Sequence, residues 1–194
     1  MKRAIDIVVS SLALVVLSPL LLVIAVAVLV TLGRPILFAQ QRAGRRSNPF
    51  TIRKFRTMTD DRDSHGDPLP DAERLNAFGR FLRSTSLDEL PEFFNVLRGE
   101  MSLVGPRPLP VHYLPRYSQR HARRHEVRPG ITGLAQVNGR NLTTWSDRLD
   151  MDVWYVDNRS LILDLQLLSR TVESVISRNG VSAKGYATMP EFQG

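Results

Sequence analysis

An apolar run near the amino terminus constrains this chain more than any other feature of its sequence. Residues 7–32 include no charged side chain, but Ser18-Pro19 interrupts the run near its middle. A straight helix over these residues would measure about 39 Å, enough to cross a hydrocarbon core of about 30 Å. Proline lacks a backbone donor and clashes with the preceding turn, so it kinks or ends a helix. The two halves would be about 17 and 20 Å long, and each is too short to cross alone.

Basic residues flank this run at both ends. Lys2 and Arg3 precede it, and a cluster follows it: Arg34, Arg42, Arg45, Arg46, Arg53, Lys54 and Arg56. Basic flanks stay on the cytoplasmic side, so a re-entrant helix that turns at Ser18 and Pro19 satisfies both ends. A tilted, kinked crossing is an equally good alternative on these residues alone, because membrane helices tolerate proline. A secretory signal cleaved after Ala27 fits less well, because apolar residues continue and the basic cluster resists export.

The positive charge of the chain is concentrated beside the apolar run. The chain has 194 residues and a formal net charge of +7. Residues 1–58 carry nine Lys or Arg against one acid, whereas residues 59–194 carry seventeen against eighteen. This distribution favours a phospholipid membrane as partner and not nucleic acid, for which no module is recognisable. The absence of cysteine excludes disulfides and thiolate metal sites.

Beyond the run, the pattern predicts one α+β domain that is mostly helical. A short β-hairpin over 36–40 and 50–55 is followed by several amphipathic surface helices. We expect helices over 72–82, 110–124, 145–156 and 162–176, a short strand over 134–137 and a turn over 128–133. The Arg-rich helix over 110–124 is a second candidate for the lipid surface. Thr144 and Asp147 are spaced like a capping pattern at a helix start.

Asp88-Glu89 is the acidic pair most able to support catalysis. A helix that begins at Asp88 puts Pro91 in the first turn, where its missing donor costs nothing, and puts both carboxylates at the positive end of the helix dipole. On these residues alone, an aspartate cap with an exposed glutamate is the commoner arrangement. Five cations beside turns make a catalytic role for the pair more plausible: Lys54, Arg83, Arg107, Arg128 and Arg140. Each of them by itself is more often a solvated charge. Acids and cations together are what phosphoryl transfer uses.

At these residues the sequence resembles the small monotopic phosphoglycosyl transferases of the bacterial sugar transferase family, in their minimal catalytic-domain form. The resemblance extends from Lys2 to about Gly180. The motifs that carry it are Lys2-Arg3 with Asp6, Ser18-Pro19, residues 53–58 (RKFRTM), 87–92 (LDELPE), 102–108 (SLVGPRP), 128–133 (RPGITG) and 152–156 (DVWYV).

The resemblance implies an enzyme at the cytoplasmic face of the bacterial inner membrane. Its reaction would move a phosphosugar from a UDP-sugar to polyprenyl (undecaprenyl) phosphate and release UMP, the first membrane step of a glycoconjugate pathway. Asp88 would be the nucleophile and the ligand of Mg²⁺, and Glu89 would act as base or metal partner. Lys54, Arg83, Arg107, Arg128 and Arg140 would contact phosphates or nucleotide. An acceptor dissolved in the membrane also favours re-entry over a crossing.

The resemblance implies three segments. Residues 1–33 would form the re-entrant hairpin, 34–180 the cytoplasmic catalytic domain at the interface, and 181–194 a loose tail. The motifs name neither the sugar nor the oligomeric state. Two other function classes stay open: a non-catalytic membrane-anchored protein that binds anionic lipid, and a glycosyl transferase that moves sugar without phosphate and releases UDP.

Overall fold

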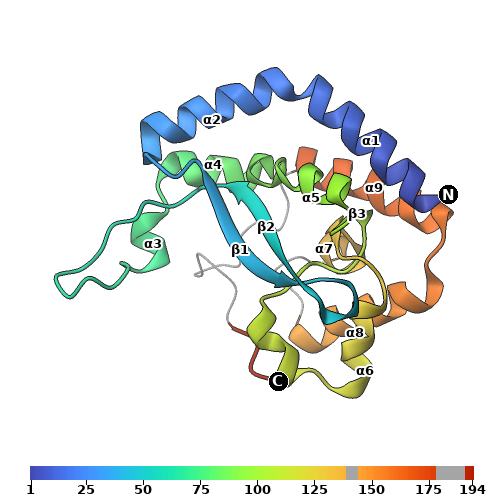
Figure 1. Ribbon diagram of the computed structural model, residues 1–194. Helices are drawn as coiled ribbons and strands as arrows, with labels where there is room; N and C mark the ends of the chain where they lie inside the picture. Colours follow the sequence, from blue (N-terminus) through green and yellow to red (C-terminus); the bar gives the residue numbers. More distant parts are fainter. Residues whose placement is uncertain (139–143, 178–190) are drawn as a thin grey trace.

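A computed structural model describes residues 1–138, 144–177 and 191–194 of the chain. Figure 1 shows an arch of two helices, α1 and α2, lying above a body of shorter helices and two small sheets. The described part is mostly helical, which confirms the expected α+β class. Helix α1 packs on α5 and helix α2 packs on β2, so the arch rests on the body along most of its length.

The apolar run forms two helices that meet at a sharp bend. Helix α1 (Lys2–Val16) ends at Leu17, and α2 (Ser18–Leu32) carries Pro19 in its first turn, so the break falls where proline predicts it. Within the described residues no single helix has the length and apolar composition to cross a membrane, whereas the pair together has both but is bent by 63°. Both helices expose large apolar side chains, among them Val8, Leu12, Val15, Leu22, Val23 and Val30.

The first two turns of α1 are bound tightly to the body. Lys2 forms an ion pair with Asp164, and Arg3 donates to two carbonyls in the last turn of α5, at 2.6 and 2.9 Å. Asp6 is buried and accepts hydrogen bonds from the start of β3. These polar contacts orient the arch relative to the body.

The predicted hairpin is confirmed and is longer than expected. Strands β1 (Leu37–Ala43) and β2 (Pro49–Phe55) are antiparallel and pair from Leu37 with Phe55 to Ala43 with Pro49, and the short 3₁₀ turn η1 (Arg45–Ser47) joins them. A second sheet pairs β3 (Ser102–Val104) in parallel with β4 (Gly130–Thr132).

The sequence prediction assigned the residues after Arg128 incorrectly. Residues 130–132, expected as a turn, form strand β4, and residues 134–137, expected as a strand, form the single helical turn α7 (Leu134–Val137). A Cβ at Gly130 would lie 2.1 Å from the amide nitrogen of Gly105, so glycine here permits the two backbones to pair closely. Apolar runs this short do not distinguish strand from helix.

Two predicted helices are interrupted. Residues 72–82 divide into α3 (Asp71–Arg74) and α4 (Ala77–Ser84), because the Asn76 side chain accepts a hydrogen bond from Gly79 N at 2.8 Å and starts a new helix. Residues 110–124 form three short pieces: η3 (Val111–Arg116), α6 (Gln119–Ala122) and η4 (Arg123–Glu126). Arg124 does not face lipid, because it is buried and bound to Asp152 at 2.6 Å.

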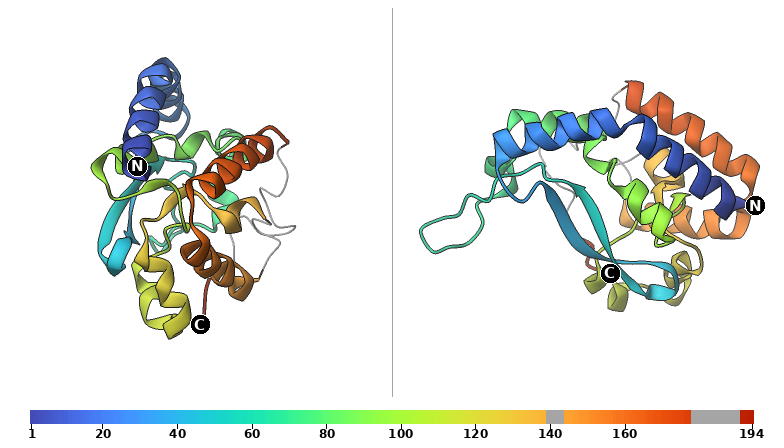
Figure 2. Two further views of the ribbon diagram at one scale, coloured as in Figure 1. Left: turned by 90° about the vertical axis from the view of Figure 1, so that its right-hand side faces the viewer. Right: turned by 45° about the horizontal axis from the view of Figure 1, so that its top comes forward.

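The last two helices agree with the prediction. Thr144 and Asp147 form the expected capping box at the start of α8 (Trp145–Asn158), and α9 (Leu161–Ser177) follows. The start of α9 lies near the start of α1, where Asp164 pairs with Lys2 (Figure 2). Of the tail expected over 181–194, the structure describes only residues 191–194, in which Phe192 is buried against Tyr113, Tyr117 and Trp145.

Candidate functional site

The acidic pair lies in a tight turn that precedes a helix. The 3₁₀ turn η2 (Leu87–Glu89) comes first, and helix α5 (Glu92–Arg98) begins only after Pro91. The expectation that this helix starts at Asp88 is therefore wrong. Pro91 has no N–H, so the chain enters the helix immediately after it, and Ser86 turns the backbone beforehand with φ at 56°. The carboxylates are positioned by this turn and not by the first turn of α5.

Apolar packing holds the turn in place. Leu87 and Leu90 pack against a buried cluster that includes Val28 of α2, Phe55 of β2 and Leu82 of α4. The arch, the hairpin and the acidic turn thus share one core, which ties the position of the acids to that of α2.

Glu89 is bound by two cations from distant parts of the chain. Its Oε1 accepts from Lys54 Nζ of β2 at 2.5 Å and from Arg107 Nη2 at 2.8 Å. Burial by itself would raise the pKa of Glu89, but Arg107 and Lys54 hold it well below its ordinary value. Glu89 is therefore an ionised carboxylate whose Oε1 is bound by two cations, and it raises the pKa of Arg107 in turn.

Asp88 has the opposite environment. It is 8% exposed, and in the described part of the chain no hydrogen bond or ion pair reaches its carboxylate. Burial and the negative charge of Glu89 raise the pKa of Asp88 to about 6. The positive charges of Lys54, Arg107 and Arg83 lower this pKa but do not cancel the increase. An unengaged carboxylate that is ionised near neutral pH and surrounded by cations can attack phosphorus or bind a metal ion.

Glu92 is a member of this cluster that the sequence reasoning missed. Its Oε1 lies 3.0 Å from Lys54 Nζ, and it is almost fully buried. Burial raises the pKa of Glu92 to about 7 despite the nearby Lys54 charge. Its position one residue after Pro91, on the first turn of α5, was the available signal.

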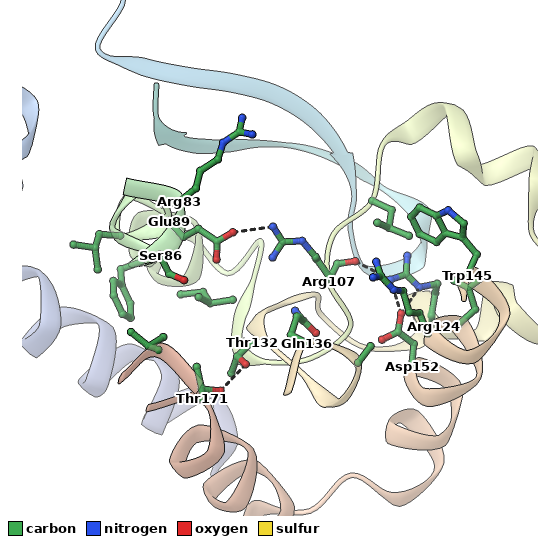
Figure 3. Close-up of a pocket in the computed structure, with 18 residues that line it drawn as sticks. Arg83, Ser86, Glu89, Arg107, Arg124, Thr132, Gln136, Trp145, Asp152 and Thr171 are labelled. Carbon is green, nitrogen blue, oxygen red and sulfur yellow. Dashed lines mark hydrogen bonds and ion pairs between the residues drawn. The ribbon is translucent and has the colours of Figure 1, made fainter. Parts of the chain in front are cut away.

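A pocket of about 310 Å³ opens beside Glu89. Figure 3 shows Glu89, Arg83 and Ser86 toward one end and Arg124, Asp152 and Trp145 toward the other, with Gln136 and Arg107, which reaches toward Glu89, between them. Apolar side chains from α5, β4, α7 and α8 complete the wall, including Phe93, Ile131, Ala135 and Leu149. Asp88 is not part of this lining, although it adjoins Glu89 in the chain. The pocket has the size and mixed lining of a small-molecule site.

The predicted phosphate-binding residues separate into three groups. Lys54 and Arg107 meet at Glu89, and Arg83 lines the pocket while its Nε donates to Thr57 at 3.0 Å. Arg128 is elsewhere: it donates to the Gly99 carbonyl at 2.8 Å and lines a separate hollow of about 170 Å³ together with Lys2 and Arg3. Arg140 lies outside the described residues.

The site can accept Mg²⁺ only with help from a substrate. Over the described ranges there is no group of three or more metal-binding side chains. Mg²⁺ is commonly held by one or two carboxylates together with substrate phosphates, so the unengaged oxygens of Asp88 fit such an ion. Glu89 fits it less well, because its Oε1 already accepts from two cations.

The chain is similar to known proteins over nearly its whole length. Residues 1–178 match the model of a family described as bacterial sugar transferase. The chain is 48% identical over its whole length to an uncharacterized sugar transferase, EpsL, of Bacillus subtilis, covering 96% of that protein.

Two relatives carry named activities. The chain is 46% identical over 181 residues to the UDP-glucose:undecaprenyl-phosphate glucose-1-phosphate transferase of Klebsiella pneumoniae. It is 40% identical over 197 residues to the undecaprenyl-phosphate galactose phosphotransferase of Salmonella typhimurium. The alignments cover 88% and 93% of this chain but only 39% and 41% of those proteins.

Proposed function

The chain belongs to the bacterial sugar transferase family, and we propose that it is a phosphoglycosyl transferase. It would transfer a sugar phosphate from a UDP-sugar to polyprenyl phosphate and release UMP, as the named activities of its relatives suggest. The observation that carries the proposal is the buried carboxylate of Asp88, unengaged and with a pKa of about 6, beside Lys54, Arg83 and Arg107.

Two displacements at phosphorus make up the proposed reaction. A carboxylate oxygen of Asp88 attacks the β-phosphorus, the bond to the bridging oxygen breaks, and UMP leaves with that oxygen. A phosphate oxygen of the polyprenyl acceptor then attacks the same phosphorus and displaces Asp88. Arg107 and Arg83 compensate the charge on the phosphate oxygens, and Glu89 holds Lys54 and Arg107 in place. Mg²⁺, with Asp88 and the diphosphate as its ligands, would neutralise charge on the diphosphate.

The membrane helices would bring this chemistry to its lipid substrate. In this proposal α1 and α2 enter the cytoplasmic leaflet of the bacterial inner membrane and return to the same face. Their 63° bend, their exposed apolar side chains and the basic residues at both ends support this arrangement. Because α2 shares a core with the acidic turn, the site would lie at the interface, where a soluble donor and a lipid acceptor can meet.

The nucleotide that is released distinguishes the proposed function from its alternatives. Purified protein in detergent with Mg²⁺, undecaprenyl phosphate and a panel of UDP-sugars should release UMP from at least one donor. Without acceptor, the protein should gain the mass of one sugar phosphate on the peptide that contains Asp88. Release of UDP would instead identify a glycosyl transferase, and vesicle binding without any nucleotide release would identify a lipid-binding protein.

Topology is tested separately. The chain has no cysteine, so the exposed positions Ala4→Cys and Ser47→Cys can each be introduced alone. Both should react with an impermeant maleimide from the same side of sealed vesicles. Labelling from opposite sides would establish a crossing.

A further inference from the structure

The pocket contains an amide side chain that the proposed chemistry does not use. Gln136 lies in α7, and Figure 3 shows it between the two ends of the pocket. Its Oε1 and Nε2 are both buried, and neither has a hydrogen-bond partner among the described residues. Buried polar groups in folded proteins nearly always have partners, so an orphaned donor and acceptor in one side chain requires an explanation.

The surroundings of Gln136 do not supply those partners. The hydroxyls of Thr132 and Thr171, which also line the pocket, bond to each other at 2.7 Å. Asp152 accepts two hydrogen bonds from Arg124 on Oδ2, while its Oδ1 is buried and has no partner in the described part of the chain. This part of the pocket therefore offers one donor and two acceptors to which no described residue forms a hydrogen bond.

The chemistry of these groups differs from that of the acidic turn. Phosphates require cations, and Lys54 and Arg107 meet at Glu89, whereas Arg124 near Asp152 is buried and bound to that carboxylate. Gln136 instead offers a neutral, planar donor and acceptor side by side, among Ile131, Ala135 and Leu149. A flat heterocycle with an N–H next to a carbonyl matches this pattern along its edge and fits apolar walls with its faces.

We propose that Gln136 reads the uracil base of the nucleotide. Its Oε1 accepts the N3–H of the base, and its Nε2 donates to an adjacent base carbonyl. Asp152 Oδ1 is the acceptor for a ribose hydroxyl. This assignment rests on the proposed function, because it identifies the base of the UDP-sugar as the occupant of this part of the pocket.

Binding of UMP tests the assignment, because UMP carries the base and ribose but not the transferred sugar. By isothermal titration calorimetry, Gln136→Met, which keeps the length of the side chain and loses both polar atoms, should bind UMP at least about tenfold more weakly than the wild type. Gln119→Met, an exposed position on α6, is the matched control and should bind as the wild type does.

A modified ligand makes the test independent of how the variant folds. N3-methyl-UMP lacks the N–H that Gln136 Oε1 would accept, so the wild type should bind it at least about tenfold more weakly than UMP. In Gln136→Met this preference should nearly disappear, which is the coupling expected of two groups in direct contact.

Three results would overturn the assignment: a wild type that binds both nucleotides equally, a variant that keeps the full preference for UMP, or unchanged UMP binding with a raised KM for the UDP-sugar. The last result would assign Gln136 to the sugar. A wild type that neither binds UMP nor releases it would instead refute the proposed function itself.

Discussion

Two parts of the pocket, the acidic turn and the surroundings of Gln136, differ in how their polar groups are paired. At the acidic turn, Glu89 is already bound by Lys54 and Arg107, so the charges needed near a phosphate are held in place by the protein itself. Around Gln136, polar atoms are buried and have no hydrogen-bond partner among the residues that the structure describes. Under the proposed function, the acidic turn would be organised for reaction before the substrate arrives, and the part around Gln136 would recognise the substrate.

Asp88 and Glu89, adjacent in the acidic turn, differ in the same way. Glu89 is bound by two cations and has a lowered pKa, whereas Asp88 has no hydrogen bond or ion pair within residues 1–138, 144–177 and 191–194 and has a pKa raised to about 6. A carboxylate bound to two cations is a poor nucleophile, and an unengaged one retains its reactivity. In the proposed reaction Glu89 positions the two cations, and Asp88 is the acid that reacts.

The largest effect is expected from Asp88→Asn. The amide has the same shape but cannot form an acyl phosphate, so UMP release should fall by at least about 10³-fold. Asp157→Asn, at an exposed aspartate paired with Arg123, is the control and should retain activity. UMP release at the wild-type rate from Asp88→Asn would remove Asp88 from the reaction.

A smaller effect should distinguish two arginines that the sequence treated alike. Arg107→Gln should lower kcat/KM for the UDP-sugar by about 10- to 100-fold, because Arg107 lines the pocket and pairs with Glu89. Arg128→Gln should change it by less than about threefold, because Arg128 lines the separate hollow near Lys2. Initial rates at several donor concentrations measure both, and equal losses would contradict the placement of Arg128 outside the site.

The pH dependence follows from Asp88. With a pKa of about 6, the rate of adduct formation without acceptor should rise about tenfold between pH 5 and pH 7 and then level off. Glu89→Gln removes a negative charge that raises the pKa of Asp88 and frees two cations that lower it, so the midpoint should move to lower pH. Rapid-quench measurements at matched ionic strength give both profiles, and an unchanged midpoint would show that another group sets it.

Thermal stability should change in opposite directions at the two acids. The folded-state pKa of Asp88 is above its ordinary value of 3.8, so its ionisation costs stability as pH rises from about 4 through about 6. Asp88→Asn removes that cost and should raise Tm at pH 7. The pKa of Glu89 is lowered, so its contribution is present above its ordinary value of 4.5, and Glu89→Gln should lower Tm at pH 7.

In a domain of this size, about 1 kcal/mol corresponds to a change of about 2–4 °C in Tm. Differential scanning fluorimetry in detergent at pH 4 and pH 7 measures these shifts. The increase from Asp88→Asn should be smaller at pH 4, where Asp88 is largely protonated in the folded protein. A decrease in Tm for both variants at pH 7 would contradict the prediction that the ionised Asp88 side chain destabilises the folded protein.

Local features were predictable because their causes are local. Pro19 has no amide proton, so the helix breaks beside it, and Thr144 with Asp147 caps a helix through atoms three residues apart. The hairpin was also recognisable from its alternating residues and loop. The prediction failed where short segments depend on distant partners, as in β4, which is a strand because β3 lies beside it.

The composition of the site depended on packing between distant segments. The sequence by itself singled out Asp88-Glu89 and a set of cations, because an acidic pair next to proline and arginines next to turns can be recognised without coordinates. It could not show that Lys54, 35 residues earlier, and Arg107, 18 residues later, share one oxygen of Glu89. Nor could it show that Arg128 lines another hollow, or that the buried Gln136 amide has no hydrogen-bond partner in the described part of the chain. Partnership between distant side chains is set by how helices and strands pack, and no local pattern encodes it.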